Sequence, residues 1–88
     1  MRIAFDRDAW QQYLHWQQSD PVVAAKLNGF IEECQRRPFH GLGRPEPLKN
    51  DLKGWWSRRL TQEDRLVYRV TGAAPGQTLE IIQCRYYY

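Results

Sequence analysis

Four arginines, Arg58, Arg59, Arg65 and Arg69, lie close together in residues 54–70, GWWSRRLTQEDRLVYRV. This segment is typical of two short strands joined by a polar turn. Like charges on neighbouring strands destabilise a hairpin, so these side chains need either water or an anion around them. A planar guanidinium binds phosphate oxygens through two parallel hydrogen bonds. The pattern therefore indicates a phosphate-binding site or a solvated basic face.

The alternation of strand side chains places two of the arginines on one face. If residues 62–64 form a three-residue loop, Thr61 lies opposite Arg65 and Arg59 lies opposite Val67. Arg59 and Arg65 are then diagonal neighbours within reach of one phosphate group. The alternative is that both form salt bridges with nearby carboxylates, which are those of Asp51, Glu63 and Asp64.

The other face of this hairpin is apolar and should pack against helices. Arg58 is the one charged residue that does not fit this division. We expect it at the edge of the sheet, with its aliphatic stem over a tryptophan or tyrosine ring. The apolar face comprises Trp56, Leu60, Leu66, Tyr68 and Val70.

The residues before the hairpin predict one strand and two helices. Residues 2–5 form a strand candidate that ends at Asp6, a candidate N-cap. Asp20 followed by Pro21 is a clearer helix start, and Pro38 lies just beyond the end of that helix. The expected core face is Trp10, Tyr13, Leu14 and Gln17 in the first helix, and Val23, Leu27, Phe30, Ile31 and Cys34 in the second.

Residues 38–47, PFHGLGRPEP, predict an ordered, stiff loop without regular structure, because they contain three prolines and two glycines. Strands follow at about 54–61, 65–71 and 78–85, and the last of these should turn Tyr86 inward. The order is β-α-α-β-β-β. It predicts a single α+β domain over residues 1–88, in which two helices pack on one face of a small antiparallel sheet.

The charge of the chain is concentrated in its second half. Residues 1–35 carry three basic and five acidic side chains, whereas residues 36–88 carry ten and five. The second half therefore has a net charge of +5, and the whole chain has +3. This asymmetry suits an anionic partner such as nucleic acid.

Composition narrows the class of protein. No apolar run approaches the ~20 residues that span a bilayer, and MRIAFDRDAW has no signal-peptide core, so we expect a cytoplasmic protein. Cys34 and Cys84 fall within apolar segments and are interpreted as buried free thiols. His15 and His40 belong to no metal-ligand motif, and we expect neither a metal nor another cofactor.

Two segments make the chain recognisable. Residues 36–70, RRPFHGLGRPEPLKNDLKGWWSRRLTQEDRLVYRV, and the final CRYYY resemble the RelE/YoeB group of bacterial toxins, most closely its YoeB branch. The likeness covers essentially the whole chain, including DRDAWQQYLHWQQSD at residues 6–20. It implies the toxin of a type II toxin–antitoxin system, with a RelE-like, microbial-RNase-like fold and a ribosome-dependent mRNA interferase activity.

The resemblance also implies roles for individual residues. In PEPLK, Glu46 matches the catalytic carboxylate and Lys49 a cation that faces the phosphate. Arg59 and Arg65 match the two catalytic arginines. At the end of the chain, Tyr87 stands where the family normally has a histidine, and Tyr88 matches the final tyrosine.

The implied chemistry is RNA cleavage without a metal. The 2′-hydroxyl attacks the adjacent phosphate, a base removes its proton, cations stabilise the phosphorane and an acid protonates the 5′-oxygen that leaves. Glu46 would be the base and Tyr87 the acid. A phenol, with an ordinary pKa of about 10, can donate a proton but is a weaker acid than histidinium. The alternative is a catalytically weakened toxin fold that binds RNA, the ribosome or an antitoxin.

Three partners follow from the resemblance. They are mRNA and 16S rRNA in the A site of the 70S ribosome, a YefM/Phd-like or RelB-like antitoxin with a disordered tail, and a second copy in a homodimer. Trp10, Trp16 and Trp55 are interface candidates, although core packing is expected for Trp10. The exposed His40 and residues 72–78 receive no role. Ribosomal RNA contacts are expected for Arg36, Arg37, Lys53 and Arg69.

Overall fold

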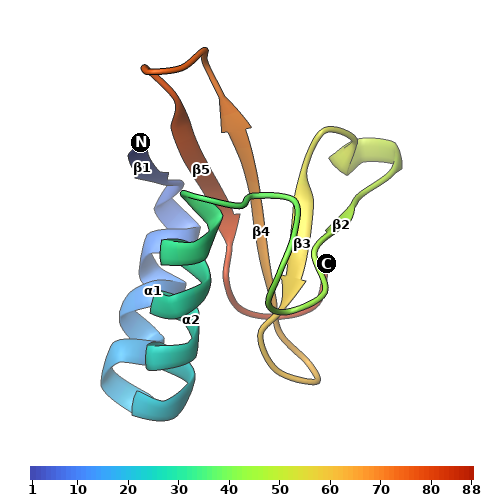
Figure 1. Ribbon diagram of the computed structural model, residues 1–88. Helices are drawn as coiled ribbons and strands as arrows, with labels where there is room; N and C mark the ends of the chain where they lie inside the picture. The colour runs from blue at the N-terminus through green and yellow to red at the C-terminus, as the bar shows by residue number, and fades with distance from the viewer.

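The computed structural model describes residues 1–88 as two helices and a five-stranded sheet (Figure 1). The chain is α+β, as predicted. Its elements are β1 (Arg2–Phe5), α1 (Arg7–Ser19), α2 (Pro21–Cys34), β2 (Glu46–Pro47), the 3₁₀ helix η1 (Asn50–Leu52), β3 (Trp56–Arg59), β4 (Arg65–Thr71) and β5 (Thr78–Gln83).

The sheet has the strand order β1-β5-β4-β3-β2. It is antiparallel except that β1 runs parallel to β5, with Arg2 opposite Thr78, so the expectation of a wholly antiparallel sheet is wrong for β1. The expectation that residues 38–47 lack regular structure is wrong at Glu46 and Pro47, which pair with β3. Proline is tolerated there because β2 is an edge strand, where a backbone N–H can be missing.

The second helix follows the sequence closely. The Asp20 carboxylate accepts a hydrogen bond from the Val23 N–H at 3.2 Å, and Pro21 occupies the first turn. Asp6 precedes α1 without a side-chain capping bond. Because helices bury one stripe of residues, the apolar face of α2 turns towards the sheet. The predicted face is confirmed, with Val23 only partly buried and Ala24 added to it.

The first helix buries a different stripe from the one expected. Ala9 and Trp16 are buried, and the Trp16 indole donates a hydrogen bond to the Cys84 carbonyl at 2.8 Å. Trp10 remains 44% exposed and stacks on Tyr13, so core packing was the wrong expectation for it. Trp16, in turn, is too deeply buried to serve as an interface residue. The buried indole of Trp16 needs a partner for its N–H, and the Cys84 carbonyl, directly after β5, supplies it.

The core contains both cysteines as unpaired thiols. Burial raises the pKa of Cys34 to about 11 and that of Cys84 to about 12. These thiols are therefore protonated and packed as small apolar side chains. The 13 residues of the buried cluster are Ala9, Trp16, Ala24, Leu27, Phe30, Ile31, Cys34, Leu60, Leu66, Tyr68, Leu79, Ile81 and Cys84. No helix is both long enough and apolar enough to cross a membrane.

The β3–β4 hairpin has a longer loop than expected. Arg59 pairs directly with Arg65, and Ser57 with Val67, so the register predicted from a three-residue loop is wrong. Asp64 closes the loop, because its carbonyl accepts from the Leu60 N–H at 3.0 Å and its carboxylate accepts from the Thr61 hydroxyl at 2.6 Å. The assignment of faces survives this shift.

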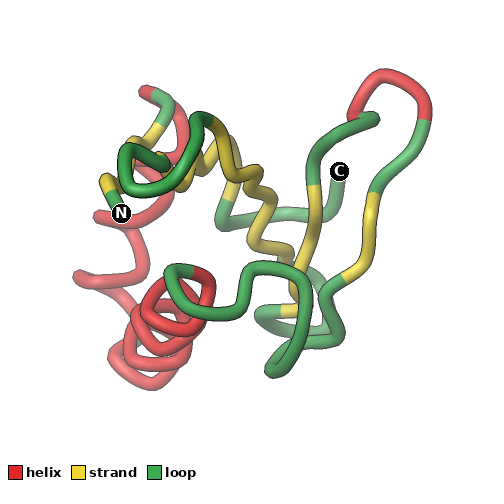
Figure 2. The backbone as a smooth tube through the Cα atoms, turned by 45° about the horizontal axis from the view of Figure 1, so that its top comes forward, coloured by secondary structure: helices red, strands yellow, loops and turns green.

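The two faces of the sheet are covered differently. Both helices lie on one side of the sheet, and β2 and η1 form the edge farthest from them (Figure 2). On the side of the helices, residues 36–45 extend the cover from the end of α2 towards β3 (Figure 1). The opposite side, here called the site face, carries Ser57, Arg59, Arg65 and Arg69 by strand alternation.

Candidate active site

Arg59 and Arg65 form a cross-strand pair of cations on the site face. The Arg59 side chain is exposed and makes no hydrogen bond within the chain. Arg65 is 7% exposed, and its Nη1 donates to the carbonyls of Thr61 and Asp64 at 2.9 and 3.0 Å. The Arg65 Nε and Nη2 groups make no such bond. Neither arginine pairs with a carboxylate, so the salt-bridge alternative is wrong.

Glu46 lies on the same face as the two arginines. It pairs with Ser57 across the β2–β3 ladder, and paired residues project their side chains to one side. A diagonal neighbour in such a ladder is about 7–8 Å away, which is the expected separation of Glu46 and Arg59. Glu46 is exposed, as is Lys49, which directly precedes η1.

The C-terminal residues bring two tyrosines to this cluster. The Tyr87 ring centroid lies 4.5 Å from the Arg65 guanidinium carbon, and Tyr87 also stacks on Tyr88. The Tyr88 hydroxyl lies 3.1 Å from that of Ser57. Figure 1 shows the chain passing from β5 towards β3, where it ends. The site therefore combines a carboxylate, cations and phenols from β2, the β3–β4 hairpin and the chain end.

Tyr86 holds this segment through its backbone. Its carbonyl accepts from the Arg65 N–H at 2.9 Å, and its N–H donates to the Asp64 carboxylate at 2.6 Å. The prediction that Tyr86 points inward is wrong, because β5 ends at Gln83 and the residue is 55% exposed with φ at +69°. Once the strand has ended, side chains no longer alternate between the two faces.

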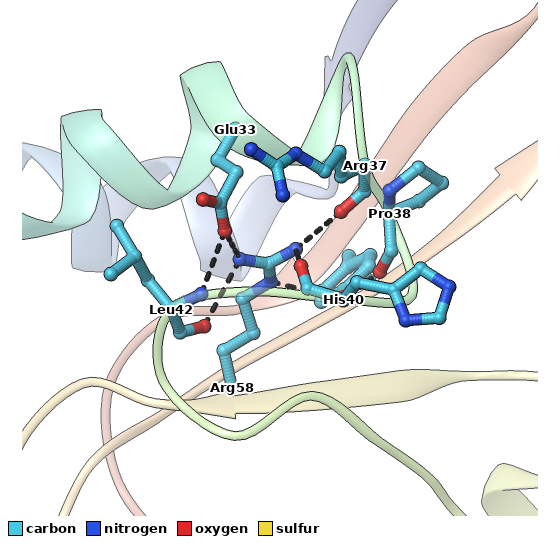
Figure 3. A network of polar contacts seen from close by, with 7 residues as sticks. Glu33, Arg37, Pro38, His40, Leu42 and Arg58 are labelled. Atoms are coloured by element: carbon cyan, nitrogen blue, oxygen red, sulfur yellow. Dashed lines mark hydrogen bonds and ion pairs between the residues drawn. The ribbon is translucent and has the colours of Figure 1, made fainter.

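Arg58 is the largest departure from expectation. It is fully buried rather than at the sheet edge, because its strand position points towards α2 and residues 36–45. Its guanidinium pairs with Glu33 and donates to the carbonyls of Arg37 and His40 at 2.6 and 2.9 Å (Figure 3). Further bonds reach the carbonyl of Leu42 and the hydroxyl of Tyr68. The charge is thus matched by a carboxylate and a ring of carbonyl oxygens.

The network fixes the loop that leads to Glu46. The Glu33 carboxylate also accepts from the Leu42 N–H at 2.8 Å, and the Gly43 carbonyl accepts from the Arg59 N–H at 2.6 Å. Gly43 has φ at +76°, and a Cβ there would lie 2.8 Å from the Phe30 ring, so a larger residue would not fit. The loop is therefore clamped between α2 and β3 directly before β2.

Hydrogen bonding and charge act together in this network. The hydrogen bond from Arg58 is the main cause that lowers the pKa of Glu33, with help from the Leu42 N–H. Desolvation pulls the pKa of Arg58 down, but hydrogen bonds to Tyr68 and Glu33 outweigh it and leave the pKa above its ordinary value. Burial raises the pKa of Tyr68. Both members of the ion pair are therefore held in their charged forms.

The other predicted basic residues lie outside the cluster. Arg36 and Arg37 are exposed at the end of α2, on the side of the helices, and Lys53 is exposed after η1. His40 is exposed as expected, and its carbonyl is used by Arg58. Arg69 is on the site face but is paired with Glu80. The one cavity, of about 200 Å³ between β1 and β5, contains none of the predicted site residues.

Sequence reasoning missed three residues that build the site. Glu33 had no signal beyond its place near the end of a helix, and Ser57 was only a small polar residue between arginines. Asp64 could have been found, because Thr-x-x-Asp next to a strand is a pattern in which side chains bond to the turn backbone. All three position residues of the candidate site.

Comparison with known proteins identifies the family. The family model described as "YoeB-like toxin of bacterial type II toxin-antitoxin system" matches residues 5–88. The chain belongs to this family. The resemblance stated from the sequence is thereby confirmed, and the chain is a toxin of the type II toxin–antitoxin class.

Individual YoeB proteins are similar over their whole length. Toxin YoeB of Escherichia coli K12 is 46% identical over 88 residues, which is all of both chains. The structure of a YoeB/ParE toxin from Agrobacterium tumefaciens is 48% identical, with a TM-score of 0.97 and full coverage of both chains. The YoeB dimer from Staphylococcus aureus is 35% identical, with a TM-score of 0.88 over 100% of this chain and 98% of that one.

Proposed function

We propose that this YoeB-family toxin is an endoribonuclease that cleaves mRNA in the ribosomal A site and so inhibits translation. The observation that carries the proposal is the cross-strand pairing of Arg59 with Arg65 on a face that the exposed Glu46 shares. Two guanidiniums without carboxylate partners suit a phosphate group. Arg59 and Glu46 are exposed rather than enclosed in a cavity, which suits a polymer.

The site supports cleavage by the RNA itself. Glu46 would take the proton of the 2′-hydroxyl, whose oxygen then bonds to the adjacent phosphorus. Arg59, Arg65 and Lys49 would stabilise the negative charge of the phosphorane, which is the largest share of such catalysis. The bond from phosphorus to the 5′-oxygen then breaks, leaving a 2′,3′-cyclic phosphate and, after protonation, a 5′-hydroxyl. No step in this sequence requires a metal ion.

Tyr87 is the proposed acid for the leaving oxygen. Tyr87 as a whole residue is 62% exposed, and its ring rests on the Arg65 guanidinium, beside the proposed phosphate site. A ligand held by that arginine would therefore lie next to the Tyr87 ring. Tyr88, bonded to Ser57, would support the RNA next to the cleaved bond.

The proposed partners follow from the family and the charge. Basic surface residues outside the cluster would bind 16S rRNA of the 70S ribosome, which implies a cytoplasmic location; these are Arg36, Arg37 and Lys53. A Staphylococcus aureus structure contains YoeB with YefM as a heterotetrameric toxin–antitoxin complex. We propose an antitoxin of the same kind here, and a homodimer as in the YoeB dimer of that organism.

Primer extension on programmed 70S ribosomes tests this function. Glu46→Gln and Arg59→Met should each lower the rate of cleavage by about 100-fold or more, because a base and a charge-stabilising donor are lost. Glu32→Gln, an exposed carboxylate on α2, is the matched control and should cleave normally. Wild-type protein that occupies the A site without cleaving would instead support the weakened toxin fold.

A further inference from the structure

Trp55 and Arg69 form a stacked pair on the site face. The Arg69 guanidinium carbon lies 4.4 Å from the centroid of the Trp55 ring. Glu80, the cross-strand partner of Arg69 on β5, receives both Nε and Nη2 of the guanidinium at 3.3 Å. The Arg69 side chain is still 42% exposed. A flat cation is therefore fixed on an indole and remains accessible from solution.

Glu80 changes what Arg69 can bind. The Glu80 carboxylate balances the charge of Arg69 and occupies the Nε and Nη2 groups of its guanidinium. Arg69 is therefore poorly suited to be the free phosphate-binding cation that the sequence predicted. Its plane, and the indole below it, remain suited to another flat group. Nucleobases stack on arginine and on aromatic rings in single-stranded nucleic-acid sites.

The pair is continuous with the proposed catalytic cluster. Ser57 and Arg59 alternate onto the site face, as do Arg65, Val67 and Arg69. Trp55, directly before β3, lies on the same side because its ring contacts Arg69. Trp55 is four positions before Arg59, which is about 13 Å of extended chain at ~3.3 Å per residue. Stacked nucleotides rise ~3.4 Å each, so this distance exceeds the step to an adjacent base. Tyr88, bonded to Ser57, lies between the two ends.

We propose that the Trp55–Arg69 pair is a nucleobase-binding subsite for single-stranded RNA, separated from the cleaved phosphate by more than one nucleotide. The inference rests on the proposed function, because it places that phosphate between Arg59 and Arg65. RNA is favoured over a protein partner because the pair and the two unpaired cations share one face. The subsite recognises a base and adds affinity; it takes no part in the chemistry.

The test measures binding rather than cleavage. Ribosomes are programmed with an uncleavable mRNA that has 2′-deoxy nucleotides in the A-site codon, and each nucleotide around this codon is replaced in turn by an abasic one. Dissociation constants are measured by co-sedimentation for wild type, Trp55→Ala, Trp55→Phe and Arg69→Gln. Lys26→Gln is the matched control, since Lys26 lies over the Phe30 ring on α2.

One abasic position, not adjacent to the cleaved phosphate, should weaken wild-type binding by about 5- to 150-fold. Trp55→Ala should bind intact mRNA more weakly by the same factor. The abasic nucleotide at that position should then weaken its binding no further. Trp55→Phe should keep most of the affinity, Arg69→Gln should lose part of it, and Lys26→Gln should behave as wild type.

The inference is overturned if Trp55→Ala responds to every abasic position as wild type does, or if it weakens antitoxin binding alone. If Trp55→Ala does not fold, the same comparison is made with Arg69→Gln: an unchanged response to every abasic position overturns the inference. Cleavage of the matched all-ribose mRNA is measured in parallel. If the wild-type protein does not cleave this mRNA but shows the expected binding pattern, the proposed reaction is contradicted and the subsite is supported.

Discussion

Replacing Arg58 with methionine removes the charged centre of the loop network but keeps most of the stem. The Glu33 carboxylate then loses its cation, and the carbonyls of Arg37 and His40 lose their donors. Removing one partner of a buried ion pair costs about 3–5 kcal/mol. A chain of 88 residues has a total stability of about 4–13 kcal/mol. Arg58→Met should therefore remove between about a quarter and all of the free energy of unfolding.

Urea unfolding followed by circular dichroism measures this loss. Arg36→Met, an exposed arginine at the same end of α2, is the control and should change the stability by less than about 0.5 kcal/mol. Arg58→Lys should not restore wild-type stability, because a single ammonium cannot reach the five acceptors of a planar fork. Adding Glu33→Gln to Arg58→Met should recover part of the loss, since the orphaned charge is gone.

A small effect would refute this reasoning. One such result is a loss of less than about 1 kcal/mol of unfolding free energy in Arg58→Met. Another is additivity, in which the double variant loses the sum of what Arg58→Met and Glu33→Gln lose singly. In either case the two residues would not act as a pair. A stable variant would also show that the loop before Glu46 is held by other contacts, such as the bond from the Arg59 N–H to the Gly43 carbonyl.

Two further predictions concern the proposed acid and the response to low pH. Tyr87→Phe should slow cleavage by about 100-fold or more, whereas Tyr86→Phe should have no effect. Tyr87→His should restore cleavage best near pH 6.5. An unchanged rate in Tyr87→Phe would show that Tyr87 is not the acid. The pKa of Glu33 lies below its ordinary 4.5, mainly because of the bond from Arg58. The stability it contributes is full above pH 4.5 and is lost as the pH falls through the lowered value. Unfolding curves between pH 6 and 2 should show wild type converging on Glu33→Gln below pH 4.5, and a constant difference would contradict the assignment.

Local signals in the sequence were sufficient for much of the fold. Asp20 followed by Pro21 specified the start of α2, and the alternation in residues 65–71 gave β4 with its correct ends. These features depend on neighbours in the chain, so they are visible without tertiary information. The faces of the hairpin were also correct, because alternation does not depend on the length of the loop.

Features that depend on distant contacts could not be predicted in this way. The burial of Arg58 requires Glu33 and three carbonyls from a different part of the chain. The stripe that α1 buries is set by the end of β5, which accepts the Trp16 N–H. The position of Tyr86 is set by the Asp64 carboxylate, which accepts a hydrogen bond from its N–H. Each depends on a partner far away in the sequence.

For the candidate site, the sequence supplied residue types and the family supplied roles. Glu46 could not be joined to Arg59 by pattern alone, because the β2–β3 pairing follows a proline-rich loop. Only the fold shows that the two share a face. Arg69 shows the converse. The sequence placed β4 and the start of β5 correctly, but it did not give the register that pairs Arg69 with Glu80.

The most direct test of the central claim is the need for one 2′-hydroxyl. Purified protein is added to programmed 70S ribosomes carrying mRNA that is either all ribose or 2′-deoxy only at the nucleotide before the cut. We predict cleavage of the first mRNA within the A-site codon, with a 2′,3′-cyclic phosphate end, and no cleavage of the second at that position. Equal cleavage of both mRNAs, or binding without any cleavage, would contradict the proposed reaction.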